Sequence, residues 1–121
     1  MKNLLQTLCG LFLVVFYSSC MNSGDNRVDV LIVGGGASGV TSGIQAARMG
    51  ANTLILEETT WLGGMLTSAG VSAVDGNYRL PAGLWGEFKN RLSDYYGGLD
   101  SLKTGWVSNV LFEPSVGNKI F

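Results

Sequence analysis

The stretch VDVLIVGGGASG at residues 28–39 decides the fold of this chain. Its first six residues are mostly apolar and β-branched, as expected of a strand buried in a parallel sheet. The glycines that follow, at positions 34, 36 and 39, form the pattern G-x-G-x-x-G. A second apolar run at residues 53–56 ends on Glu57. This order predicts a strand–turn–helix–strand unit, and hence an α/β fold of the Rossmann-like, doubly wound class.

Each glycine of the pattern has a physical role in binding a dinucleotide. Gly34 allows a sharp turn out of the strand, Gly36 lets a pyrophosphate approach the backbone, and Gly39 allows close packing of the helix. The free N–H groups at the start of that helix, together with its dipole, favour an anionic group. We therefore assign pyrophosphate binding to Gly34, Gly36, Ala37, Ser38 and Gly39.

Glu57 stands at the carboxyl end of the second predicted strand. From there its carboxylate can accept hydrogen bonds from the hydroxyls of an adenosine ribose, and it would repel a 2′-phosphate. A P-loop is excluded, because it requires Gly-Lys-Ser/Thr where this chain has Gly39 followed by Val40 and Thr41. A kinase glycine loop is excluded as well, since it lies in a hairpin rather than before a helix. A Rossmann-like unit that binds no ligand is the alternative.

The segment LGGMLT at residues 62–67 adds a family resemblance. With the glycine pattern and Glu57, it resembles the FAD-dependent oxidoreductases of the glutathione-reductase-like two-domain fold, and in particular a bacterial branch of them. The resemblance covers residues 28–121. It implies FAD as the cofactor, in contact with Gly63, Gly64 and Met65. From the residues alone, Gly63-Gly64 is a permissive turn, and an ordinary loop turn is the alternative.

The resemblance also implies an activity and a longer protein. Such enzymes pass a hydride from a small-molecule substrate to the flavin, which carries the redox chemistry. They continue for several hundred residues. We therefore expect residues 28–121 to be the amino-terminal, truncated part of an FAD-binding domain, an incomplete Rossmann-like unit whose catalytic residues lie elsewhere. Two other interpretations stay open, namely an NAD-binding dehydrogenase or reductase and a non-catalytic, truncated, lipid-anchored remnant.

The first 27 residues predict export and anchoring. Lys2, an apolar run at residues 4–16 and the serines before Cys20 are typical of a signal peptide at residues 1–19. The apolar run is shorter than the ~20 residues that span a bilayer as a helix. Cys20 resembles the cysteine of the bacterial lipobox, which implies lipidation there and a membrane-attached lipoprotein of the bacterial cell envelope. Ordinary signal-peptidase cleavage is the alternative. The polar residues 20–27 suit a tether.

The remaining pattern predicts packing elements and excludes several kinds of site. Residues 80–96 predict a helix, residues 109–112 a short strand, and Pro114 the first turn of another helix. The buried face of the first helix is expected to comprise Leu84, Phe88, Leu92 and Tyr95. The chain has no histidine, which excludes His-based triads and histidine metal sites, and we expect no metal. A formal net charge of −1 without a basic patch gives no indication of nucleic acid binding.

Overall fold

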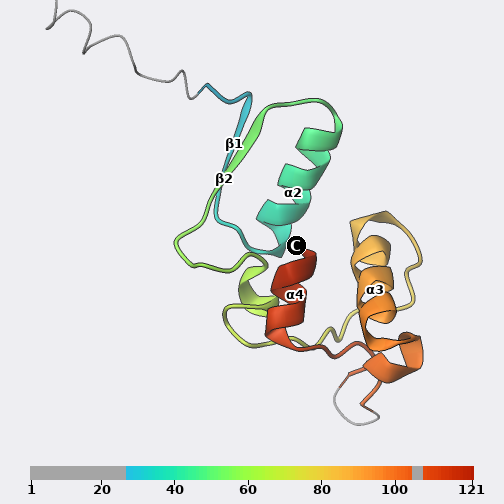
Figure 1. Ribbon diagram of the computed structural model, residues 1–121. Coiled ribbons are helices and arrows are strands. Elements are labelled where there is room, and N and C mark those ends of the chain that lie inside the picture. The colour runs from blue at the N-terminus through green and yellow to red at the C-terminus, as the bar shows by residue number, and fades with distance from the viewer. Residues whose placement is uncertain (1–26, 105–107) are drawn as a thin grey trace, which may run out of the picture.

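The computed structural model describes residues 27–104 and 108–121. The predicted signal peptide, the lipidation site at Cys20 and nearly all of the tether lie outside the described residues. Within these residues, a strand–helix–strand unit is followed by two α-helices and two short 3₁₀ helices (Figure 1). No helix of the described part is long and apolar enough to cross a bilayer.

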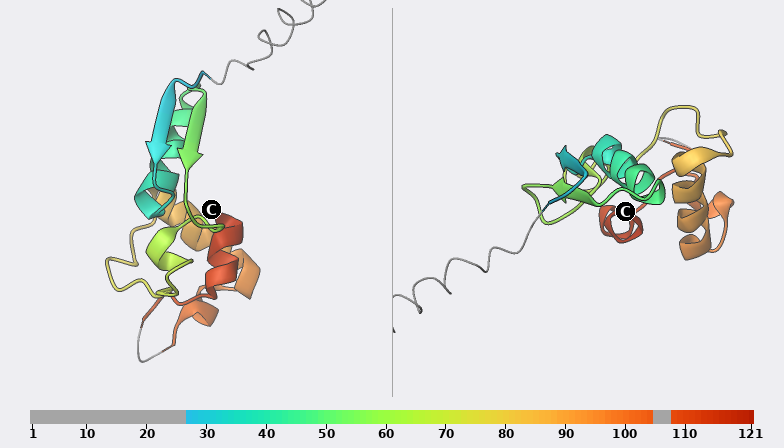
Figure 2. Two further views of the ribbon diagram at one scale, coloured as in Figure 1. Left: turned by 90° about the vertical axis from the view of Figure 1, so that its left-hand side faces the viewer. Right: turned by 90° about the horizontal axis from the view of Figure 1, so that it is seen from above.

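The strand–helix–strand unit forms as the sequence predicts. It consists of β1 (Val30–Val33), α2 (Ala37–Arg48) and β2 (Thr53–Leu56). The two strands are parallel neighbours, in a register that runs from Val30 opposite Thr53 to Val33 opposite Leu56. The helix α2 lies along one face of this two-stranded sheet (Figure 2). The α/β class and its Rossmann-like unit are thereby confirmed.

The two faces of the sheet differ in what covers them. On the α2 side the packing is close, because an added Cβ at Gly43 would lie 2.7 Å from Cδ1 of Ile55 and 3.3 Å from Cδ1 of Ile32. The opposite face presents exposed apolar side chains, those of Leu31, Val33, Leu54 and Leu56. Parallel sheets are normally covered on both faces, whereas the described residues cover only the face toward α2.

The rest of the described chain packs around a second core. Its helices are η1 (Gly64–Leu66), α3 (Gly83–Tyr96), η2 (Leu99–Leu102) and α4 (Pro114–Ile120). Its buried apolar residues are Phe88, Leu92, Leu102, Val110, Phe112 and Val116. The ring of Phe88 stacks on that of Phe121 with centroids 4.7 Å apart and meets Phe112 edge-on at 5.3 Å. Such aromatic contacts add about 0.5–1.5 kcal/mol each beyond the area that they bury, so they hold the residues that flank α4 against α3.

The helix predicted at residues 80–96 is confirmed as α3, with a later start. It ends at Gly97, which has a left-handed conformation with φ of +78°. The prediction that Tyr95 belongs to the buried face of this helix is wrong, because its side chain is 58% exposed. Tyr96 packs against the core instead. Its hydroxyl accepts a hydrogen bond from the N–H of Glu113 (2.9 Å) and donates one to Oε2 of Glu113 (3.0 Å), which fixes Tyr96 at the start of α4.

The strand predicted at residues 109–112 is wrong. Only a single antiparallel bridge, between Ala73 and Leu111, forms there. Ser108 provides the reason, because its hydroxyl accepts a hydrogen bond from the N–H of Val110 (3.1 Å), a group that a strand would use for its ladder. The Ser108 hydroxyl thus takes the place of a carbonyl on a neighbouring strand as the acceptor for this N–H. The helix predicted after this segment is confirmed as α4.

Candidate functional site

The glycine loop between β1 and α2 is shaped by close backbone approaches. Gly34 has a φ of +100°, and its N–H donates to the carbonyl of Leu56 at the end of β2 (2.8 Å). An added Cβ at Gly39 would lie 1.9 Å from the carbonyl oxygen of Gly34 and 3.4 Å from Cγ2 of Ile32. The predicted reason for Gly39 was helix packing on the sheet. The turn itself imposes the tighter limit, since no side chain fits beside the Gly34 carbonyl.

The start of α2 offers unpaired backbone donors beside open space. Within the described residues, the N–H groups of Gly36, Ser38 and Gly39 donate no hydrogen bond, and Gly36 caps the helix without a side-chain contact. An added Cβ at Gly36 would have no neighbour within 4 Å. Free N–H groups at a helix N-terminus, where the helix dipole is positive, favour phosphate. Ala37 is the first residue of this helix. The residues assigned to a pyrophosphate therefore present it with donors and with room.

Glu57 is held as a charged carboxylate by donors on two sides. Its Oε1 accepts hydrogen bonds from the N–H of Thr59 (3.0 Å) and from the Thr59 hydroxyl (2.9 Å). Its Oε2 accepts one from the N–H of Gly35. These bonds, with those from the backbone of Thr59 and Gly35 contributing most, lower the pKa of Glu57 from its ordinary value. Since a carboxylate has about four acceptor positions, Glu57 keeps capacity for a ribose hydroxyl.

The structure adds two residues that the glycine pattern leaves unassigned. Gly35 is buried, and an added Cβ would lie 2.7 Å from Cδ2 of Leu62 and 2.9 Å from Oε2 of Glu57. It must therefore be a glycine if Glu57 is to reach the loop backbone. Thr59 orients the same carboxylate from the other side. The unbroken run of three glycines was a signal for Gly35, whereas no sequence pattern marks Thr59.

The second glycine pair lies directly against the first loop. The N–H of Gly63 donates to the carbonyl of Gly35 (2.7 Å), and a parallel bridge joins Gly63 to Gly36. An added Cβ at Gly64 would lie 2.9 Å from Cα of Gly36. Both glycines of the pair have positive φ, +104° at Gly63 and +56° at Gly64. Met65 follows them and is 67% exposed. Residues assigned from two separate motifs are thus brought to one place.

The helix α4 supports this second glycine loop from the far end of the chain. Oδ1 of Asn118 accepts a hydrogen bond from the N–H of Leu62 (2.8 Å). The hydroxyl of Thr67, which is 1% exposed, donates to the carbonyl of Leu62 (2.5 Å). An added Cβ at Gly63 would lie 2.5 Å from the ring of Phe121. The loop is therefore held from both sides, by Thr67 of the LGGMLT segment and by Asn118 and Phe121, which no sequence pattern singles out.

The two glycine loops and Glu57 present hydrogen-bonding groups of the kinds that a dinucleotide requires. Within residues 27–104 and 108–121, no group of three or more His, Cys, Asp or Glu side chains could hold a metal ion. Free N–H groups, an ionised carboxylate and two glycine loops in contact instead provide donors for phosphate and acceptors for sugar hydroxyls.

Comparison with known proteins bears on the same segment. A sequence model of the family described as FAD dependent oxidoreductase matches residues 29–121, which is most of the chain. No curated protein and no solved structure matches. The matched residues include the glycine loop, Glu57 and the second glycine pair.

Proposed function

This chain belongs to the FAD dependent oxidoreductase family, and on that premise we propose that the two glycine loops and Glu57 form its FAD site. The protein is an FAD-binding oxidoreductase with FAD as its cofactor. The family match thereby decides against the NAD-dependent alternative that the sequence left open.

Each group of residues in the proposed site contacts a different part of the cofactor. The unpaired N–H groups of Gly36, Ser38 and Gly39, with Gly34 as the turn before them and Ala37 between them, bind the pyrophosphate. The carboxylate of Glu57 accepts from a ribose hydroxyl of the adenosine half. Gly63 and Gly64 contribute backbone beside the same loop, and Met65 lies next to the cofactor. The observation that carries this proposal is the contact between the two loops, from the N–H of Gly63 to the carbonyl of Gly35.

The described residues contribute binding and orientation. Bound FAD supplies the acceptor for a hydride from a small-molecule substrate. Gly35 and Thr59 keep Glu57 charged and aimed beside the loop, and Asn118 holds the second loop in position. None of these groups donates or removes a proton in the proposed role. Their task is to fix the dinucleotide end of the cofactor.

Flavin retention tests the FAD site. The full chain is incubated with FAD and passed over a gel-filtration column, and flavin absorbance is recorded across the protein peak. We expect flavin to co-elute with the protein and to be retained about tenfold less after Glu57→Ala, the loss expected for hydrogen bonds to a charged group. Glu58→Ala is the matched control, because it removes the same charge from the next, exposed position. Equal retention by both variants would overturn the ribose assignment. A protein peak without flavin would favour the non-catalytic interpretation.

We also propose that the mature protein is attached to a bacterial envelope membrane through lipidated Cys20. The support is the order of Lys2, the apolar run at residues 4–16, the serines before Cys20 and the polar tether that follows. The test is metabolic labelling with a radioactive fatty acid, followed by membrane fractionation. We expect label on the wild-type protein and none after Cys20→Ala. Label that persists in the variant, or its absence from the wild type, would favour ordinary signal-peptidase cleavage.

A further inference from the structure

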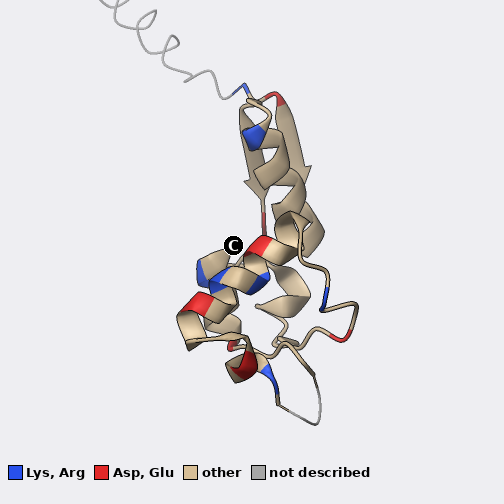
Figure 3. Cartoon of the chain, turned by 90° about the vertical axis from the view of Figure 1, so that its right-hand side faces the viewer, with Lys and Arg blue, Asp and Glu red and all other residues tan. Residues whose placement is uncertain are grey.

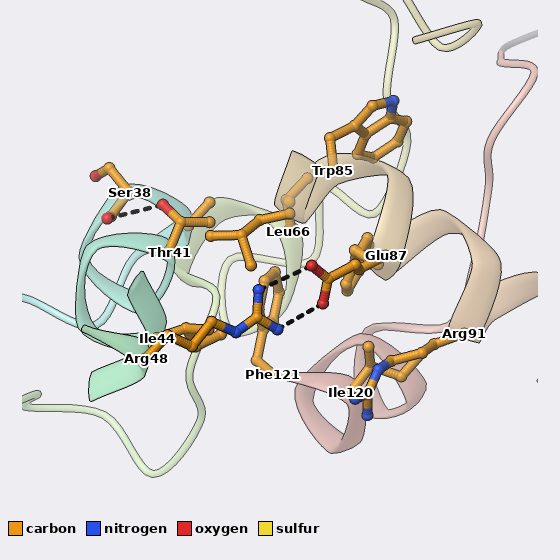
Figure 4. A pocket seen from close by; sticks show the side chains of 13 residues that line it. Ser38, Thr41, Ile44, Arg48, Leu66, Trp85, Glu87, Arg91, Ile120 and Phe121 are labelled. Atoms are coloured by element: carbon orange, nitrogen blue, oxygen red, sulfur yellow. Dashed lines mark hydrogen bonds and ion pairs between the residues drawn. The ribbon is translucent and has the colours of Figure 1, made fainter. Parts of the chain in front are cut away.

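A pocket of about 500 Å³ lies between α2 and α3, and the end of α4 closes one side of it (Figure 4). Its apolar wall consists of Ile44, Leu66, Leu84, Phe88, Ile120 and Phe121. Small-molecule sites typically have volumes of roughly 300–1,000 Å³ and mostly apolar walls. The pocket therefore has the size and lining of a site for one small ligand.

An ion pair crosses this pocket from one helix to the other. The guanidinium of Arg48 on α2 donates to both carboxylate oxygens of Glu87 on α3, at 2.8 and 2.6 Å (Figure 4). Both side chains are 45% exposed. In this bidentate geometry the positive charge of Arg48 and the negative charge of Glu87 neutralise each other. The pair therefore leaves the pocket wall neutral at this point.

Arg91 gives the pocket an unbalanced positive charge. Charges of both signs occur along α3 (Figure 3), but among the described side chains that line the pocket only those of Arg48, Glu87 and Arg91 are charged. Within the described residues, Arg91 makes no hydrogen bond and no ion pair, and its influence on Glu87 is only through space. The pocket lining thus holds two guanidinium groups and one carboxylate. In Figure 4, Ser38 and Arg91 lie on opposite sides of the Arg48–Glu87 pair.

We propose that this pocket binds a small organic carboxylate with an apolar body, at a site adjacent to that of FAD. The carboxylate lies on the free guanidinium of Arg91, whose planar fork matches its two oxygens. The apolar body lies against the aromatic and aliphatic wall, where an uncharged polar group would lose its hydrogen bonds to water. A phosphate dianion fits less well, because only one guanidinium is free to balance it. The two sites meet at Ala37 and Ser38, which line the pocket at the start of α2.

The test compares an acid with its neutral counterpart. The full chain is titrated with 3-phenylpropionate and with 3-phenylpropanamide by isothermal calorimetry. We expect the acid to bind about tenfold more tightly than the amide, the ratio expected for a charge-assisted hydrogen bond at a partly exposed site. Arg91→Gln should remove that preference. Glu87→Gln should strengthen binding of the acid, because it frees the charge of Arg48, and an unfolded variant could not produce such a gain.

The control and the competing occupants complete this test. Arg79→Gln removes an exposed guanidinium that does not line the pocket and should leave the affinity for the acid unchanged. Equal affinities for acid and amide, or an unchanged preference in Arg91→Gln, would overturn the proposal. Displacement of 3-phenylpropionate by FAD would overturn it as well, because the pocket would then be part of the cofactor site. Binding of the acid in a protein that retains no flavin would instead count against the FAD site alone.

Discussion

Glu57 and Gly35, which are separated by 22 positions in the chain, are joined by a hydrogen bond from the Gly35 backbone N–H to the Glu57 carboxylate. The bond links the end of β2 to the glycine loop after β1. In the proposed function, this is a connection between the ribose contact and the pyrophosphate contact. A substitution at either residue should therefore weaken the contacts to both the ribose and the pyrophosphate.

The ionisation of Glu57 predicts a pH dependence of stability. Its folded-state pKa lies below the ordinary value of 4.5, first because the Thr59 N–H donates to it. The stabilisation is therefore fully present above pH 4.5 and is lost as the pH falls through the lower, folded-state pKa. Glu57→Gln should remove this contribution. We expect the urea midpoints of wild type and variant to differ most above pH 4.5 and to converge in acid. A constant difference across that range would contradict the prediction.

A methyl group at Gly35 should disturb both stability and flavin retention. Its Cβ would meet Cδ2 of Leu62 at 2.7 Å and the Glu57 carboxylate at 2.9 Å. Overpacking of this kind costs about 1–3 kcal/mol, so we expect Gly35→Ala to lower the free energy of unfolding by that amount in urea titrations. Gly76→Ala is the control, because an added Cβ there has no neighbour within 4 Å. Similar losses in both variants would show that the contact does not matter.

Asn118 should act on the cofactor site without touching the first loop. Asn118→Ala removes the acceptor for the N–H of Leu62 and releases the segment before Gly63. We expect a loss of about 1 kcal/mol in unfolding free energy, the usual net value of one hydrogen bond, and weaker flavin retention. Both are measured against Asn109→Ala, an exposed amide outside this loop. Undiminished flavin retention in Asn118→Ala would show that this contact from α4 does not support the cofactor site.

Lys89 should be a structural residue despite its charge. It is only 9% exposed, and its Nζ donates to the carbonyls of Tyr78 (2.9 Å) and Leu80 (3.0 Å). Lys89→Met keeps much of the packing but leaves two carbonyls without this donor, which should cost about 1–3 kcal/mol. Thermal unfolding measures the loss. Lys103→Met, at an exposed position paired with Asp100, should change the midpoint little, and equal effects would contradict the role given to Lys89.

The sequence predicted what depends on local pattern. The apolar runs, the glycine spacing and Pro114 predict β1, α2, β2 and the start of α4, because each pattern lies in neighbouring residues. Contacts between distant segments were not predictable in this way. Asn118 reaches Leu62 across 56 positions, and Lys89 is buried although lysine side chains are mostly exposed in proteins. In the same way, Tyr96 rather than Tyr95 turns inward because of Glu113, which no helical periodicity could indicate.

The uncovered face of the β1–β2 sheet should influence how the chain behaves in solution. Leu31, Val33, Leu54 and Leu56 lie exposed on two adjacent strands, which are the only strands of the sheet in the described part of the chain. Such a face favours packing against another apolar surface, and the outer edges of the two strands can pair with a further strand. We therefore expect self-association to increase with protein concentration, so that ligand binding is best measured in dilute samples.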